Sequence, residues 1–203
     1  MAKIHLIRHA QSLANAERRY QGQSYDTDLS DLGCQQAKIL ADFLRSEPIR
    51  KIVTSPLKRA HQTAEIIAEN FALSVEAEPL LIETNHGRWE GQKFIDLQSG
   101  DSDLWELWQT RPSQMIFPGG EAFAATAVRV LSWWQMAQNW TEDAIVVTHD
   151  NIIQVLLTHL HGLPLDRIRD YRIRNTAVTT IELTRPPVVH AVGDISHLAD
   201  FSL

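Results

Sequence analysis

Five side chains that could do chemistry share one feature: each closely follows a short apolar segment typical of a buried strand. They are Arg8 and His9 after residues 4–7, Arg59 after residues 51–54, Glu83 after residues 80–82 and His149 after residues 145–148. Ligands of open α/β sheets bind outside the carboxyl ends of the strands, at helix N-termini. If these strands are parallel neighbours, the five side chains converge on one anion-binding site.

These residue types fit one reaction, the transfer of a phosphoryl group. Two guanidiniums offer rigid bidentate donors to phosphoryl oxygens. A neutral imidazole is a competent nucleophile, and a second histidine can stabilise the developing oxygen charge. A carboxyl group with a raised pKa can protonate a leaving oxygen and later take a proton from water. Because phosphoryl transfer needs mainly positioning and charge neutralisation, the arginines could do here what Mg²⁺ does in other enzymes.

Each of these residues alone has a more ordinary explanation. An arginine that begins a helix is usually a surface charge, and a lone histidine is more often structural than catalytic. The combination favours a site, because five polar side chains at four strand ends would otherwise all lie unused in the crevice where this class of fold binds ligands.

The elements that must position these side chains are predicted by short apolar runs alternating with longer helical patterns, which is typical of an α/β domain. The pattern predicts strands over residues 4–7, 51–54, 144–148, 177–184 and, at an edge, 188–192. It predicts a helix capped by Ser30, a helix entered through Ser55 as N-cap and Pro56 at its first position, and helices over residues 120–139 and 151–161. We expect a single domain over residues 1–203, since no linker or repeat marks a second.

Residues 87–121 break this pattern and are rich in aromatic side chains, which are Trp89, Phe94, Trp105, Trp108 and Phe117. We expect this segment to be an inserted cap that leans over one end of the sheet and sets substrate specificity. The alternative is that the aromatic side chains simply fill a small satellite core.

Composition narrows the classes of partner. The 203 residues carry 19 Lys and Arg against 25 Asp and Glu, a formal net charge of −6. An acidic surface argues against nucleic acid or an anionic membrane as the main partner. The single cysteine, Cys34, cannot form an internal disulfide, and no signal or membrane-spanning segment is evident, so we expect a cytoplasmic protein.

Four spaced motifs, in order along essentially the whole chain, resemble those of the histidine phosphatase superfamily, the phosphoglycerate-mutase-like enzymes, and more closely its phosphatase branch. They are Arg8-His9-Ala10-Gln11-Ser12 followed by Asn15, then Ser55-Pro56-Leu57-Lys58-Arg59-Ala60, then Leu81-Ile82-Glu83 with Gly87, Trp89, Glu90 and Gly91, and finally Val146-Val147-Thr148-His149. The resemblance implies a three-layer α/β/α sandwich with a mostly parallel central sheet, helices on both faces and a short inserted cap.

The resemblance also implies a role for each matching residue. His9 would be the nucleophile that becomes phosphohistidine, and Glu83 the general acid and then the base. Arg8, Arg59 and His149 would complete the phosphate pocket. The residues expected to line the site around them are Ser12, Asn15, Gln21 and Gly22. The resemblance implies no metal and no organic cofactor.

Two departures from the family pattern lie beside the expected site. Ala10 replaces the usual glycine after the nucleophile, so this position must tolerate a Cβ. Asp150 and Asn151 replace a common Gly-Gly pair after His149, and we include both among the candidate substrate-binding residues. A carboxylate there would repel an anionic substrate, so we expect Asp150 to turn away and cap the following helix.

The residues leave several functions open. The preferred one is a metal-independent phosphomonoesterase acting on a small phosphorylated metabolite, with inorganic phosphate as product. The alternatives are a cofactor-dependent phosphoglycerate mutase and, from another class, a non-catalytic phosphate-binding module. A metal hydrolase is disfavoured because the nine histidines show no ligand spacing. The β-branched strands near the C-terminus offer an edge through which two copies could pair as a homodimer.

Overall fold

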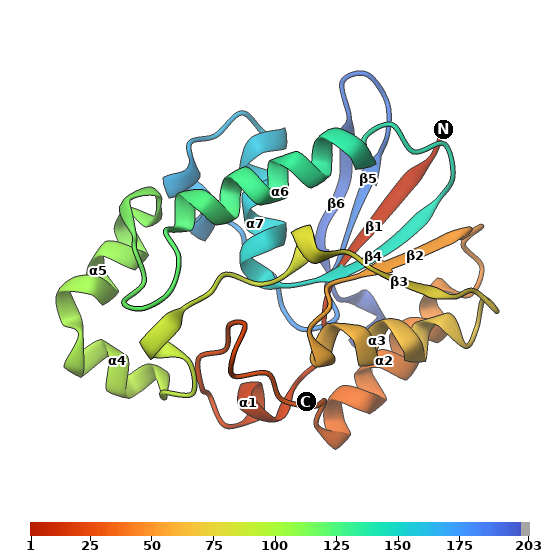
Figure 1. Ribbon diagram of the computed structural model, residues 1–203. Helices are drawn as coiled ribbons and strands as arrows, with labels where there is room; N and C mark the ends of the chain where they lie inside the picture. Colours follow the sequence, from red (N-terminus) through yellow and green to blue (C-terminus); the bar gives the residue numbers. More distant parts are fainter. Residues whose placement is uncertain (200–203) are drawn as a thin grey trace.

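A mixed six-stranded sheet forms the centre of the computed structural model, which describes residues 1–199 (Figure 1). Its strands lie in the order β3-β2-β4-β1-β5-β6. The first four are parallel to one another, and β5 and β6 pair in antiparallel fashion. Their bounds are β1 (Lys3–Arg8), β2 (Lys51–Thr54), β3 (Val75–Ala77), β4 (Ala144–Thr148), β5 (Val178–Glu182) and β6 (Val188–Asp194).

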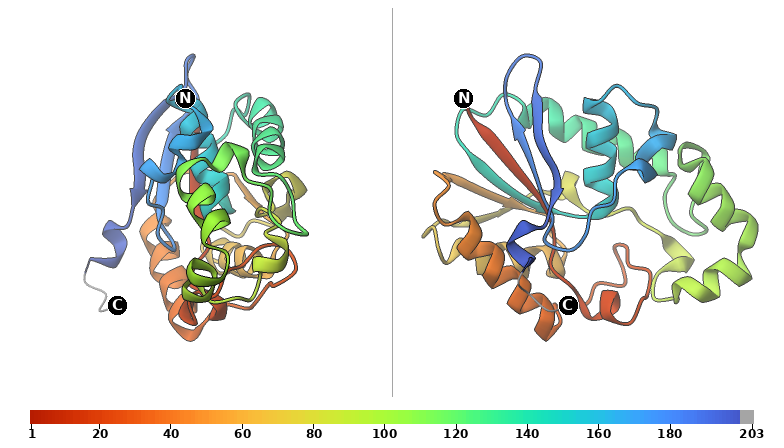
Figure 2. Two further views of the ribbon diagram at one scale, coloured as in Figure 1. Left: turned by 90° about the vertical axis from the view of Figure 1, so that its left-hand side faces the viewer. Right: turned by 180° about the vertical axis from the view of Figure 1, so that it is seen from behind.

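Helices cover both faces of this sheet, which confirms the three-layer α/β/α prediction (Figure 2). Side chains that alternate along β1 point to opposite faces, so Ile7 packs with helices α2 and α3 while Ile4 and Leu6 pack with α6 and α7. All five residues of β4 are buried, as expected for a central parallel strand. The helix bounds are α1 (Leu13–Ala16), α2 (Asp31–Leu44), α3 (Lys58–Ala68), α4 (Phe94–Gly100), α5 (Ser102–Thr110), α6 (Phe123–Ala137) and α7 (Asp150–Leu160).

The start of α2 follows the sequence prediction. The Ser30 hydroxyl accepts a hydrogen bond from the Gly33 N–H at 3.0 Å and so satisfies one of the free donors at the helix start. The predicted helices over residues 120–139 and 151–161 are present as α6 and α7, and the predicted edge strand is present as β6, extended to Asp194.

Two local predictions are wrong. Residues 80–82 are not a strand: Pro79–Leu81 form a short 3₁₀ helix, because the proline fixes its φ and the Glu78 carboxylate caps the turn by accepting from the Leu80 N–H. Ser55 does not cap α3, whose N-cap is Leu57. Its hydroxyl instead accepts from the Leu57 N–H and contacts His149.

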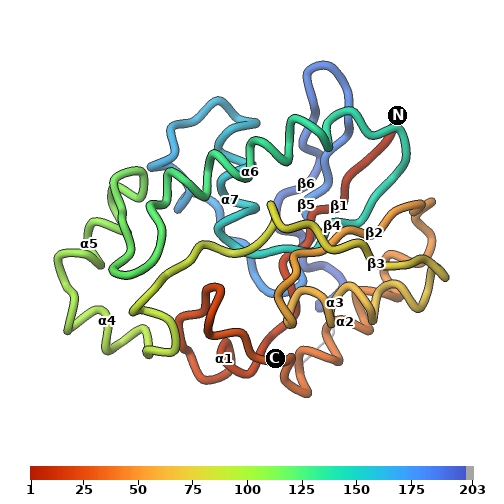
Figure 3. The backbone as a smooth tube through the Cα atoms, in the orientation of Figure 1, coloured from red at the N-terminus to blue at the C-terminus, as the bar shows by residue number. Residues whose placement is uncertain are grey.

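The segment with α4 and α5 lies at one side of the molecule, away from the edge formed by β3 (Figure 3). It packs beside the loop that follows α1, where the Tyr20 N–H donates to the Gln92 carbonyl at 2.8 Å. Trp89 and Phe117 are fully buried against neighbouring aromatic rings, so these two side chains fill a satellite core. Within residues 1–199, no helix has the length and apolar character needed to cross a membrane.

The approach of α2 to the loop after β1 depends on Gly33. A Cβ at this position would lie 1.9 Å from the Gln11 carbonyl oxygen, which is backbone and cannot move freely. We therefore predict that Gly33→Ala lowers the free energy of unfolding by about 1–3 kcal/mol through overpacking. Urea denaturation measures the change.

Gly100→Ala is the matched control, because a Cβ at the end of α4 meets nothing within 4 Å. Since alanine favours helix over glycine, this variant should be as stable as the native protein or slightly more so. Equal stability of the Gly33→Ala and Gly100→Ala proteins would contradict the close approach.

Candidate active site

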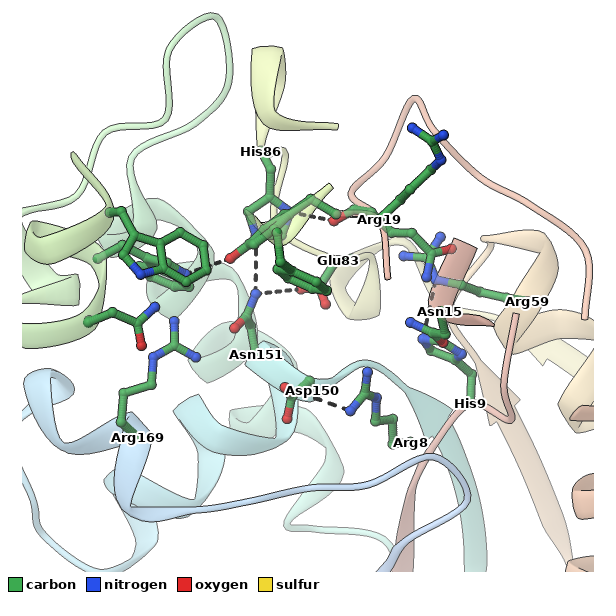
Figure 4. A pocket seen from close by; sticks show the side chains of 16 residues that line it. Arg8, His9, Asn15, Arg19, Arg59, Glu83, His86, Asp150, Asn151 and Arg169 are labelled. Carbon is green, nitrogen blue, oxygen red and sulfur yellow. Dashed lines mark hydrogen bonds and ion pairs between the residues drawn. The ribbon is translucent and has the colours of Figure 1, made fainter. Parts of the chain in front are cut away.

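Most of the side chains singled out from the sequence surround one pocket of about 260 Å³ (Figure 4). Of the candidates, those that line it are Arg8, His9, Asn15, Gln21, Arg59, Glu83, Asp150 and Asn151. Three aromatic side chains of the expected cap also line it, which are Phe94, Trp105 and Trp108. The lining residues that the sequence analysis did not single out are Arg19, Tyr20, His86, Gln109 and Arg169.

His9 is held as a neutral imidazole in one tautomer. Its Nδ1 lies 2.8 Å from the Ala10 carbonyl oxygen, which can only accept, so Nδ1 carries the proton. The Arg59 Nε–H donates to His9 Nε2 at 3.3 Å, so Nε2 carries the lone pair. Burial, and then the charges of Arg59 and Arg8, hold the pKa of His9 well below its ordinary value. The imidazole is therefore an uncharged ring whose lone pair is on Nε2.

The backbone around His9 is fixed from several sides. The His9 N–H donates to the Thr148 carbonyl at 2.9 Å, which ties the end of β1 to the end of β4. The Ala10 N–H donates to the Thr63 hydroxyl at 3.0 Å. The Ala10 methyl is fully buried against Leu29 and Ala37, which explains why this position accepts a side chain in place of glycine.

Arg59 is a buried guanidinium whose hydrogen bonds fix its orientation. Nη1 pairs with the Asp26 carboxylate at 2.9 Å, and Nη2 donates to the Gly22 carbonyl at 3.0 Å. Gly22 therefore acts through its backbone and is not among the residues that line the pocket. Asp26 was missed by the sequence analysis, because only the folded chain brings it to Arg59.

Arg8 and Asp150 face each other across the pocket wall. Arg8 Nη1 donates to the Ile173 carbonyl at 2.6 Å and lies 3.8 Å from an Asp150 carboxylate oxygen. The expectation that Asp150 turns away as a helix cap is wrong: His149 is the N-cap, and Asp150 is the first residue of α7. Burial raises the pKa of Asp150, although Arg8 and Arg169 act to lower it.

Glu83 belongs to a hydrogen-bonded chain with Asn151 and His86 (Figure 4). The Asn151 amide donates to Glu83 Oε1 at 3.3 Å and to His86 Nε2 at 3.2 Å, while His86 Nδ1–H donates to the Gln21 carbonyl at 2.6 Å. Burial lowers the pKa of His86 to about 3, so this ring is neutral and can accept at Nε2.

The environment of Glu83 favours its protonated form. Burial raises the pKa of Glu83, and the negative charge of Asp150 adds to that effect. The Thr84 N–H, which donates to Oε1 at 2.7 Å, and the charge of Arg59 oppose the shift without cancelling it. A carboxyl group with a raised pKa beside a neutral imidazole is suited to general acid catalysis.

His149 is completely buried behind His9, with the two ring centroids 5.2 Å apart, and is not among the residues that line the pocket. Its Nε2 lies 2.7 Å from the Ser55 hydroxyl. The Ser55 hydroxyl accepts from the Leu57 N–H and can donate its own proton to His149 Nε2, and the tautomer that accepts this hydrogen bond carries its proton on Nδ1. Nδ1 has no hydrogen-bond partner within residues 1–199.

Two further candidates are positioned by α1. The Ser12 hydroxyl accepts from the Asn15 N–H at 3.2 Å as the helix N-cap, and Ser12 does not line the pocket. Asn15 does line it, and its side-chain carbonyl oxygen accepts a hydrogen bond from the Asn175 side-chain amide at 3.1 Å.

The sequence held a signal for one of the residues that the sequence analysis missed. His86 lies three positions after Glu83, within the third motif.

Comparison with known proteins agrees with this geometry. Residues 4–191 match the histidine phosphatase superfamily (branch 1). A relative named phosphoserine phosphatase 1, from Hydrogenobacter thermophilus, is 33% identical over 204 residues, covering 99% of this chain and 96% of the relative. A probable phosphoglycerate mutase GpmB from Erwinia tasmaniensis is 32% identical over 212 residues, covering 100% of this chain and 98% of that protein.

Solved structures show the same fold over the length of the chain. Bacillus stearothermophilus YhfR superposes with a TM-score of 0.90 at 28% identity, covering 98% of this chain and 100% of that one. A putative alpha-ribazole-5'-P phosphatase from Escherichia coli superposes with a TM-score of 0.86 at 25% identity, covering 95% of this chain and 96% of that one. By its matching sequence, its fold and its relatives, this chain belongs to branch 1 of the histidine phosphatase superfamily.

Proposed function

We propose that the protein is a metal-independent phosphomonoesterase that hydrolyses a small phosphorylated metabolite through a phosphohistidine on His9. The observation that carries this proposal is the buried, neutral His9 with its Nε2 lone pair beside Arg59, in the same pocket as a Glu83 that favours its proton. The pocket volume of about 260 Å³ supports a small substrate.

In the first step, His9 Nε2 attacks the phosphorus atom and the bond from phosphorus to the ester oxygen breaks. The Arg59 Nε–H, which donates to His9 Nε2 in this structure, donates instead to a phosphoryl oxygen. Glu83 gives its proton to the departing oxygen, so the alcohol leaves uncharged. In the second step, the Glu83 carboxylate takes a proton from water, the resulting oxygen attacks phosphorus, and the phosphorus–nitrogen bond breaks to release phosphate and neutral His9.

In this proposal, charge on the transferring phosphoryl group is stabilised by three groups that the fold holds near His9. Arg59 is held in place by Asp26 and Gly22, and Arg8 by the Ile173 carbonyl. As the third donor we propose the Nδ1–H of His149, which has no hydrogen-bond partner within residues 1–199 but lies behind His9 and not on the pocket lining. Asn15 lies at the rim of the same pocket and supports the phosphate from that side.

The second candidate is a phosphoglycerate mutase, which is supported by relatives named probable phosphoglycerate mutase GpmB. A mutase returns the phosphoryl group from histidine to an organic acceptor instead of to water. We favour hydrolysis because the segment that we infer to be the cap, residues 87–121, is short. Its only α helices are α4 and α5, which are both small. Release of phosphate from p-nitrophenyl phosphate without 2,3-bisphosphoglycerate separates the two, and mutase turnover with negligible hydrolysis would overturn the proposal.

We predict that His9→Ala abolishes measurable hydrolysis, because the other neutral histidine that lines the pocket, His86, has its Nε2 lone pair engaged by the Asn151 amide. EDTA should leave the native activity intact, because arginines neutralise the phosphate charge in this proposal. Steady-state phosphate release measures both. His159→Ala is the matched control, because this histidine lies at the far end of α7. Hydrolysis by His9→Ala at the native rate would contradict the covalent route.

We predict that Arg59→Ala slows hydrolysis by about 10² or more, because it removes a fixed transition-state donor. Arg59→Lys keeps the charge but loses the planar fork that reaches His9, Asp26 and Gly22 together. It should therefore recover only part of the loss in kcat. A lysine variant with native kcat would show that charge alone suffices and that this hydrogen-bond geometry is dispensable.

We predict that Glu83→Gln slows hydrolysis by about 10²–10⁴, with the larger loss on alkyl phosphates, whose leaving oxygen needs a proton most. Because burial raises the pKa of Glu83, its acid form is present below that pKa and is lost as the pH rises through it. The pKa of His9 is lowered, so His9 stays neutral at the acid end. The pH profile of kcat/KM should thus fall on the alkaline side.

That alkaline limb should disappear in Glu83→Gln. The second ionisation of the substrate phosphate, at about pH 6, affects the pH profiles of both proteins equally and serves as the internal reference. If the native protein and Glu83→Gln share the same alkaline limb, Glu83 is not the proton donor.

A further inference from the structure

Arg169 differs from the other arginines of the pocket in having no hydrogen-bond or ion-pair partner within residues 1–199. Arg8, Arg19 and Arg59 each donate to a carbonyl oxygen and lie within 4.0 Å of a carboxylate. For Arg169, Nε and Nη2 are buried and have no hydrogen-bond partner within residues 1–199, and no ion pair in that part of the chain includes it. A buried charged donor without an acceptor is costly, so a native protein rarely keeps one without a use for it.

The position of Arg169 is fixed by packing and not by polar contacts. It belongs to the 3₁₀ helix Leu165–Asp170, and its guanidinium lies over the Trp108 ring, 4.1 Å from the ring centroid. Trp108 is itself buried, and its indole N–H donates to the Tyr20 hydroxyl at 2.5 Å. This cation–π contact holds the guanidinium in place and uses none of its N–H donors.

Arg169 lies at the end of the pocket opposite His9, where the proposed function places the phosphate. Figure 4 shows Arg169 on the side away from His9, with Asn151 and Asp150 between them. The phosphoryl group is taken up by His9, Arg8 and Arg59 in the proposed function. A ligand that also reaches Arg169 therefore carries its second acceptor at the end opposite its phosphate.

We propose that Arg169 binds a carboxylate of the substrate, so that the enzyme prefers small phosphomonoesters that bear a carboxylate. The inference rests on the proposed function, because it places the phosphate at His9. A planar carboxylate matches the adjacent N–H donors of a guanidinium and would supply the acceptor that Nε and Nη2 lack. A second phosphate fits less well, because its larger charge would meet the Asp150 carboxylate that lines the same pocket.

Paired substrates that differ in one carboxylate test this assignment. O-phosphoserine and O-phosphoethanolamine share the phosphate and the ammonium and differ in the carboxylate alone. 3-Phosphoglycerate and glycerol 3-phosphate form a second pair without the ammonium. We expect the native enzyme to favour the carboxylated member of at least one pair in kcat/KM by about 10–100-fold, the range for a hydrogen bond to a charged group.

Arg169→Met should reduce that preference to nearly one, since methionine keeps the packing on Trp108 and removes the donors. Arg169→Lys should restore part of it, mainly through KM. Arg167→Met is the matched control, because Arg167 lies in the same 3₁₀ helix but pairs with Asp170 outside the pocket. This variant should keep the native preference.

The outcomes separate the two proposals. A native enzyme that hydrolyses p-nitrophenyl phosphate but shows no carboxylate preference in either pair overturns the role of Arg169 and leaves the proposed function standing. A carboxylate preference that persists in Arg169→Met likewise overturns the role of Arg169 and leaves the proposed function standing. Failure of the native enzyme to hydrolyse any phosphomonoester would overturn both. If Arg169→Met does not fold, the comparison of the paired substrates in the native enzyme and in Arg169→Lys still tests the role of Arg169.

Discussion

The hydrogen bond from His9 Nδ1–H to the Ala10 carbonyl is the interaction on which the site depends. It fixes the tautomer, so the lone pair of the buried ring is on Nε2 and faces Arg59. Burial and two arginines keep the ring uncharged, because a proton on it would be desolvated and repelled. The His9 N–H donates to the Thr148 carbonyl, which links the end of β1 to the end of β4 and so helps to hold His9 in this position.

The charges of the pocket differ from those of the whole chain. The net charge is −6, yet four arginines line a pocket whose carboxyl groups are Glu83 and Asp150. Burial raises the pKa of both carboxyl groups, so negative charge on them costs more in this pocket than on an exposed carboxylate. Net charge therefore argues against an extended polyanion, which needs an extended basic face, but does not argue against one small phosphate.

Much of the fold and the position of several candidate site residues could be predicted because both depend on local patterns. The apolar run of β4 and the Ser30 cap are such patterns, and the strand ends place Arg8 and His9 at the sheet edge. The contacts of Asp26, His86 and Arg169 could not be predicted, since each meets its partner only in the folded chain. Asp150 was misplaced because its helix begins one residue earlier than expected.

Rapid quenching of the enzyme during turnover, followed by mapping of the trapped phosphate, shows whether His9 Nε2 carries the phosphoryl group. We expect an acid-labile, base-stable phosphoenzyme with phosphate on Nε2 of His9, formed at a rate no slower than kcat. Phosphate on Nδ1, phosphate on another residue, or hydrolysis with no phosphoenzyme at any time point would contradict it.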